Sequence, residues 1–184
     1  MSFVNAHFVT YAQDLGYHPM VAAGIFSMIG ACAITGALYL GHLSDKLGRR
    51  RLLGFSYQLR ATGFLIVLLS MGIPLLGIPA LGLGSLLFGV MLVGISWNSV
   101  VSITAAYASD RFGITNLGLI YGMMFAVMPL GSGLGASLGG YLHDTHGTYS
   151  WAIWSNIILL TLSAASVFSI KETKAPLPEA AAAD

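Results

Sequence analysis

Long apolar stretches, separated by short polar segments, occupy most of the chain from residue 20 onwards. A helix needs about 20 mainly apolar residues to cross the hydrocarbon core of a bilayer. Five stretches reach that length, and they are residues 20–43, 52–72, 80–108, 117–142 and 151–170. The pattern therefore predicts an all-α, polytopic membrane protein with five complete transmembrane helices.

The first residues form a shorter segment, which ends at a turn over residues 14–16. Thirteen helical residues rise about 20 Å, whereas a span needs about 30 Å. We therefore interpret residues 1–13 as the outer half of a span whose beginning is missing. The membrane bundle is expected to cover residues 1–174, and the alanine-rich residues 175–184 are expected to form a disordered tail on the cytoplasmic side.

Composition supports lipid as the solvent. The chain is 56% hydrophobic and 8% charged, whereas about 25% of the residues of a soluble domain are charged. The net charge of +1 gives no reason to expect a nucleic-acid partner, and the single cysteine excludes an internal disulfide. The sequence shows no cofactor motif and no catalytic constellation, so we expect neither an enzyme nor a metal site.

The basic residues gather on one side if the spans alternate in direction. These residues are Lys46, Arg49, Arg50, Arg51, Arg111, Lys171 and Lys174. Cytoplasmic loops carry an excess of Lys and Arg, so this side is predicted to be cytoplasmic. The chain is then expected to be a multi-pass protein of the cell (plasma) membrane with a cytoplasmic C-terminus.

The segment that follows the first span resembles a known signature. Residues 41–50 read Gly-His-Leu-Ser-Asp-Lys-Leu-Gly-Arg-Arg, which resembles the loop motif of the major facilitator superfamily. Residues 108–113 resemble that family's next cytoplasmic loop, and the glycine-rich residues 131–140 resemble its eleventh helix. The resemblance implies the C-terminal six-helix half of a twelve-helix transporter.

The resemblance also implies a function. Residues 7–16 look like the branch of monocarboxylate transporters and oxalate–formate antiporters, which implies secondary active transport of a small organic anion by alternating access. A proton could accompany the solute, and the other half would be a missing N-terminal half or a second copy of the chain. One departure is that residues 33–37, Ala-Ile-Thr-Gly-Ala, lack the acid–arginine pair that animal monocarboxylate transporters carry there. The alternatives are a truncated, non-transporting partner of a full-length transporter, and an oligomeric channel, for which no ring-forming charge is evident.

The loop motif has a conformational role in the family. Its residues here are Gly41, Asp45, Lys46, Gly48, Arg49 and Arg50. The resemblance implies that Asp45 latches onto a helix of the opposite half, which would leave it unpaired in this chain. Gly41 is expected to allow close helix approach, and Gly48 to allow a turn with positive φ. The arginines could instead serve only as topology anchors.

Arg60 is the one basic residue within a span, about 13 Å deeper than Arg51. An intramembrane arginine is a functional candidate, here for binding the solute anion. The alternatives are snorkelling towards the cytoplasmic headgroups or a structural pair. Other candidates for solute contact are polar residues within spans, namely His7, Tyr11, Asn98 and Tyr121. His7 could also carry a proton, and all four could simply form interhelical hydrogen bonds.

Glycines recur every four residues at Gly131, Gly135 and Gly139. This spacing makes one smooth helix face and predicts close helix packing. Residues 135–139 also match Gly-x-Ser-x-Gly, but that hydrolase elbow needs a strand-to-helix turn, which a continuous helix excludes. Residues 143–146, His-Asp-Thr-His, could suggest a metal site, but they stand at an external helix end with no further ligands, so we interpret them as a polar loop.

Overall fold

The computed structural model describes residues 2–72, 79–115 and 117–171. Its helices are, in chain order, α1 (Ser2–Asp14), α2 (Pro19–Leu47), α3 (Arg49–Ser70), α4 (Gly82–Phe112), α5 (Leu117–His146) and α6 (Ser150–Ser169). Helices α2–α6 are long and apolar enough to cross a membrane, which confirms the five predicted spans. No strand occurs in these ranges. The predicted tail, residues 175–184, lies outside the described residues.

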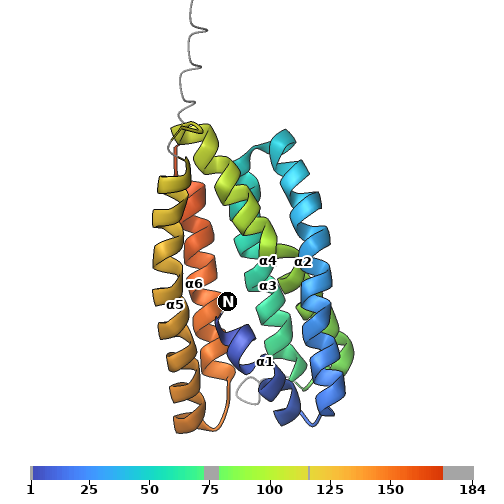
Figure 1. Ribbon diagram of the computed structural model, residues 1–184. Helices are drawn as coiled ribbons and strands as arrows, with labels where there is room; N and C mark the ends of the chain where they lie inside the picture. The colour runs from blue at the N-terminus through green and yellow to red at the C-terminus, as the bar shows by residue number, and fades with distance from the viewer. Residues whose placement is uncertain (1, 73–78, 116, 172–184) are drawn as a thin grey trace, which may run out of the picture.

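The long helices stand side by side and alternate in direction, whereas α1 covers only one end of the bundle (Figure 1). The α2–α3 turn and the ends of α4 and α6 share one end, which we call the basic end because of Lys46, Arg49, Arg50, Arg51, Arg111 and Lys171. The opposite end, where α1 meets α2 and α5 meets α6, is called the histidine end after His18, His143 and His146. The alternation thus brings the described basic residues other than Arg60 to one end.

Local signals explain where α2 begins and ends. Pro19 occupies its first turn, where a missing N–H costs nothing, and the Nδ1 of His18 accepts a hydrogen bond from the backbone N–H of Met20 at 3.3 Å. At the other end Gly48 has a φ of +95°, and its N–H bonds to the carbonyl of Ser44. That conformation suits glycine, so one residue reverses the chain into α3.

Helix α4 lies at the centre and crosses α2 and α3 at glycines. A Cβ on Gly36 would lie 1.9 Å from the carbonyl oxygen of Ile95, so α2 and α4 touch backbone to backbone there. Gly63 and Gly89 face each other across α3 and α4, and a Cβ on either would lie within 3.0 Å of the other's carbonyl oxygen. These positions, rather than the glycines of α5, are where the bundle packs most tightly.

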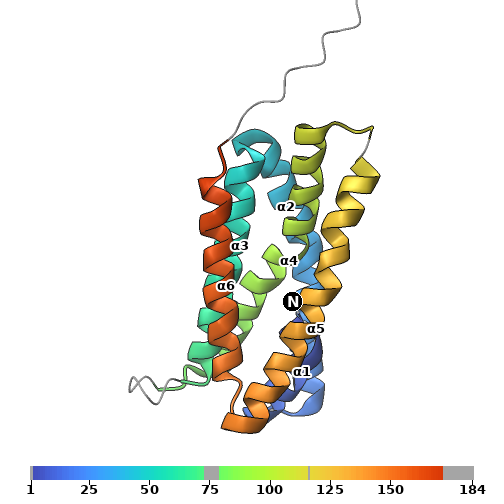
Figure 2. The ribbon, with the colours of Figure 1, turned by 90° about the vertical axis from the view of Figure 1, so that its left-hand side faces the viewer.

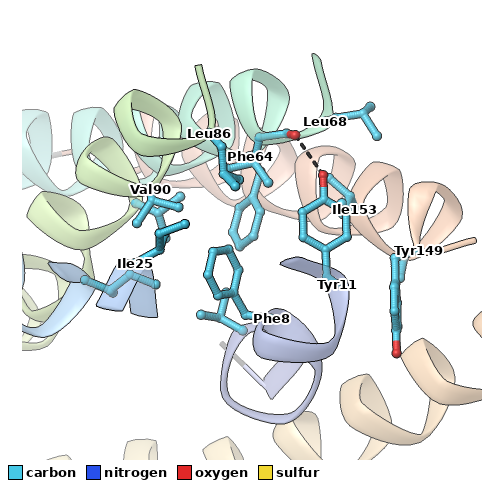
Figure 3. Packing of buried hydrophobic residues seen from close by; sticks show 14 residues of the cluster. Phe8, Tyr11, Ile25, Phe64, Leu68, Leu86, Val90, Tyr149 and Ile153 are labelled. Atoms are coloured by element: carbon cyan, nitrogen blue, oxygen red, sulfur yellow. Dashed lines mark hydrogen bonds between the residues drawn. The ribbon is translucent and has the colours of Figure 1, made fainter. Parts of the chain in front are cut away.

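An apolar core fills the half of the bundle nearest the histidine end. Figure 3 shows Phe8 of α1 beside Phe64 of α3 and Leu86 of α4, all of them buried. Ile153 of α6 completes this cluster. Burial of such side chains contributes about 1.5–3 kcal/mol each, so the cluster holds the short helix α1 against the long ones.

Helix α5 stands at the edge of the bundle in both views (Figures 1 and 2). Gly139 is its one buried residue in the described chain. The rest of the helix presents large apolar side chains outwards, among them Met123, Leu130 and Leu134. Lipid, or another membrane-embedded surface, can cover such a face.

Candidate functional site

Arg60 lies near the middle of α3 and is 4% exposed. Its Nη2 donates hydrogen bonds to the carbonyl oxygens of Ser96 and Trp97, the latter at 3.0 Å. Its Nε donates to the hydroxyl of Ser96 at 3.3 Å. The guanidinium carbon also lies 5.7 Å from the centre of the Trp97 ring, within the range of a cation–π contact.

These contacts fix the depth of the charge. Ser96 and Trp97 lie near the middle of α4, as Arg60 lies near the middle of α3. The guanidinium therefore stays midway between the two ends and does not reach back towards the basic end. The snorkelling interpretation of Arg60 is wrong, because carbonyl acceptors on the neighbouring helix hold the side chain at this level.

Among the residues that the structure describes, no carboxylate compensates this charge within the bundle. The seven acidic residues all lie in the last turn of a helix or follow α6 in the sequence. An arginine at the centre of a bilayer costs about 2.5–3.5 kcal/mol on insertion scales. A helix that keeps such a charge without an acidic partner presents a site that favours an anion.

A cavity of about 380 Å³ lies beside Arg60, between α3, α4 and α5. It is lined by Tyr57, Arg60, Val100, Val101, Thr104, Met124, Phe125, Met128, Gly131 and Ser132. Nη1 of Arg60 makes no hydrogen bond to the described part of the chain, whereas Nε and Nη2 do. The volume falls in the range of small-molecule sites, and the lining is mostly apolar with a few polar groups.

A second cavity of about 280 Å³ lies between α1, α2 and α4. Trp97 and Asn98 line it together with Phe26 and Ser27. Trp97 therefore borders the smaller cavity, and its carbonyl oxygen accepts a hydrogen bond from Arg60, which lines the larger one.

The five candidates for solute contact do not form one site. Tyr121 lies next to the larger cavity, with its hydroxyl 3.2 Å from the carbonyl oxygen of Val101 and its ring 4.6 Å from that of Phe125. Asn98 lines the smaller cavity. Two others lie apart from both. Tyr11 is 1% exposed, and its hydroxyl donates to the carbonyl oxygen of Val67. The Nε2 of His7 lies 3.1 Å from the carbonyl oxygen of Ala136.

Sequence reasoning missed the polar groups that accompany Arg60, namely Tyr57, Thr104 and Ser132. Tyr57 could have been found, because it precedes Arg60 by three residues and so shares its helix face. Ser132 stood within a glycine-rich segment that we had assigned to packing. The backbone carbonyls of Ser96 and Trp97 carry no sequence signal at all.

Arginines of the loop motif make their contacts within the described chain. Arg49 pairs with Asp45 at 2.8 Å across the α2–α3 turn and also with Asp110 near the end of α4. Arg50 donates from Nη1 to the carbonyl oxygens of Phe168 and Ile170, at 3.0 and 2.5 Å, at the end of α6. The expectation of an unpaired Asp45 is therefore wrong, because Arg49 lies four residues later and reaches it.

Two expectations about glycines need correction. A Cβ on Gly41 or on Gly131 would meet no atom within 4 Å, so neither allows a close approach within the described chain. Gly131 instead lines the larger cavity. Of the stripe on α5, Gly139 is buried, and Gly135 is partly exposed.

Comparison with known sequences now identifies the family. The profile of the Major Facilitator Superfamily matches residues 1–183. The chain belongs to the Major Facilitator Superfamily. A superfamily relative from Bacillus subtilis (strain 168), named the uncharacterized MFS-type transporter YcxA, is 32% identical over 166 residues. The match covers 89% of this chain and 39% of that relative, so the chain spans well under half of the relative's length.

Superfamily membership confirms the resemblance of the loop motif and agrees with the long apolar helices of a multi-pass membrane protein. The relative is named as a transporter. No solved structure matches the chain. The monocarboxylate or oxalate–formate branch within the superfamily stays a prediction.

Proposed function

We propose that the chain is the C-terminal half of a secondary active transporter that carries a small organic anion, such as a monocarboxylate. One observation carries the proposal. The buried guanidinium of Arg60 has no acidic partner within the spans and borders a cavity of about 380 Å³. A carboxylate in that cavity would supply the missing negative charge and could accept from Nη1.

The lining of the cavity supports a small, singly charged solute. Tyr57, Thr104 and Ser132 offer hydroxyl groups, and Met124, Phe125 and Met128 offer apolar surface. A short carboxylic acid has the same two parts, one anionic and one apolar. Because residues 33–37 of α2 carry no charge, Arg60 of α3 is the positive group of this half that a carboxylate would bind.

The remaining candidates have more limited support. Asn98 could contact solute from the smaller cavity, and Tyr121 borders the larger one through Val101 and Phe125. A solute contact by His7 or Tyr11 stays a prediction. Neither side chain lines either cavity, and both make hydrogen bonds elsewhere in the bundle.

Alternating access requires two halves that rock about a site near the midplane. The second half would be a six-helix N-terminal bundle or another copy of this chain. The network of Arg49 with Asp45 and Asp110 would make the basic end of this half move as one unit. The positive-inside rule places that end, and with it the C-terminus, in the cytoplasm of a cell whose plasma membrane holds the protein.

Uptake into proteoliposomes tests the function directly. The chain, reconstituted together with an N-terminal six-helix half, is expected to take up labelled lactate above the level of empty vesicles. Arg60→Gln is expected to reduce that uptake at least about tenfold, because it removes one charge contact from the bound state. Arg51→Gln removes an exposed charge and serves as the control. Absence of uptake by every co-expressed pair of halves would count against transport.

A further inference from the structure

The histidine end holds a cluster of titratable side chains that the solute site does not use. Nε2 of His143, in the last turn of α5, lies 3.5 Å from a carboxylate oxygen of Asp14, the last residue of α1. Nδ1 of the same ring lies 3.7 Å from a carboxylate oxygen of Asp144. Each nitrogen of one imidazole therefore faces a different carboxylate.

Tyr149, just before α6, fixes the position of this imidazole. Its ring stacks on His143 with centres 4.1 Å apart and planes 24° apart. The hydroxyl of Tyr149 lies 3.5 Å from Nδ1 of His7 on α1. Burial, with the nearby carboxylates of Asp14 and Asp144, raises the pKa of Tyr149, so its hydroxyl stays neutral near neutral pH. The cluster thus joins α1, α5 and the start of α6.

Only histidine can supply a positive charge at this end. No Lys or Arg occurs in residues 1–45, 61–110 or 112–170 of the sequence. Imidazole is the side chain whose unperturbed charge changes between pH 5 and 8. Asp14 and Asp144 therefore gain a cationic partner when His143 takes up a proton, and they have none when it is neutral.

Both ring nitrogens of His143 must carry a proton for the contacts with Asp14 and Asp144 to be favourable at the same time. A neutral imidazole has one N–H donor and one nitrogen lone pair. With a carboxylate near each nitrogen, the lone pair of neutral His143 faces a negative oxygen on one side. Protonation turns both nitrogens into donors, one towards Asp14 on α1 and one towards Asp144 on α5.

We propose that His143 is a proton-binding site whose occupancy closes a clasp between the end of α1 and the end of α5. Protonated His143 binds Asp14 across the two helices as an ion pair, and neutral His143 can hold it only by an uncharged N–H donor, which is a weaker contact. The clasp adds to other contacts that hold α1, among them the apolar core, the hydrogen bond from Tyr11 to Val67 and the contact of His7 with the carbonyl oxygen of Ala136. It depends on no solute, so its test is independent of the transport assay.

Hydrogen exchange of the full chain in lipid nanodiscs tests the clasp. After correction for intrinsic exchange rates, α1 amides are expected to be about two- to fivefold more protected at pH 5 than at pH 8, as suits a half-exposed ion pair. Asp14→Asn, which keeps the shape of the side chain, and His143→Gln are both expected to abolish this difference. His146→Gln is the control, because His146 contacts α5 and Trp151 but not α1.

The outcomes separate cleanly. Protection of α1 that is equal at the two pH values in the wild-type chain overturns the proposal. So does a pH difference that persists in Asp14→Asn. If His143→Gln fails to fold, the Asp14→Asn variant alone still decides the question.

Discussion

Replacing Gly36 with alanine is expected to destabilise the bundle by at least about 3 kcal/mol. The new Cβ would lie 1.9 Å from the carbonyl oxygen of Ile95 and 2.6 Å from its carbonyl carbon. Both atoms belong to the backbone of α4, so no side chain can rotate out of the way. The two helices must separate, and such overpacking typically costs 1–3 kcal/mol and sometimes more.

Gly24→Ala on the same helix is the matched control for this prediction. A Cβ at Gly24 would meet no atom within 4 Å, and the position is exposed. The expected change is within about 1 kcal/mol, the size of a helix-propensity effect. Reversible unfolding in mixed micelles measures both free energies. Equal effects of Gly36→Ala and Gly24→Ala would show that α2 and α4 do not touch at residue 36.

Replacing Arg60 with methionine is expected to weaken carboxylate binding at least about tenfold and to change stability little. The carboxylate loses the cationic side chain among the described residues that line the larger cavity, which removes a charge-assisted hydrogen bond. The fold loses hydrogen bonds to Ser96 and Trp97, but it also loses the cost of a buried charge. Because no buried carboxylate is left behind, these two terms nearly offset each other.

Weaker carboxylate binding without a change in stability distinguishes a binding residue from a structural one. We expect an unfolding free energy within about 1 kcal/mol of the wild type for Arg60→Met, together with the loss of binding of labelled lactate in equilibrium dialysis. Arg51→Met, at the exposed basic end, is expected to leave both quantities unchanged. A large loss of stability with binding retained would assign Arg60 to structure alone.

The apolar pattern predicted the spans because bilayer thickness sets a minimum length for each of them. It misplaced their ends, since α5 continues to His146 and α2 to Leu47, each four residues past the predicted end of its span. A helix backbone satisfies its own hydrogen bonds in headgroups as well as in lipid. Its end is therefore set by local caps such as Gly48, whose positive φ ends α2, and not by hydrophobicity.

The crossing points of the helices could not be read from the sequence. Gly36, Gly63 and Gly89 show no four-residue repeat, whereas Gly131, Gly135 and Gly139 do. In a chain whose helices are apolar on all sides, periodicity does not say which face meets which neighbour. The repeat on α5 marks a smooth face, but within this chain only Gly139 is buried.

The site was predicted in part. Arg60 could be singled out because a charge within a span is rare, and any such charge needs a reason. Its acceptors are the backbone carbonyls of Ser96 and Trp97, and every residue carries such a group. Asp45 was identified as part of the motif, but its partner was not predicted. The motif resemblance implied a partner in another half, and the local spacing to Arg49 supplied one nearby.

The most direct test of an anion site at Arg60 uses Trp97 as a reporter. In a Trp151→Phe, Trp154→Phe background Trp97 is the sole tryptophan of the chain, and its ring lies 5.7 Å from the guanidinium. Titration with lactate in nanodiscs should give a saturable change in its fluorescence, and the neutral amide of lactate should give none. An equal response to both compounds, or no saturable response to lactate, would contradict the assignment of Arg60 as the anion-binding residue.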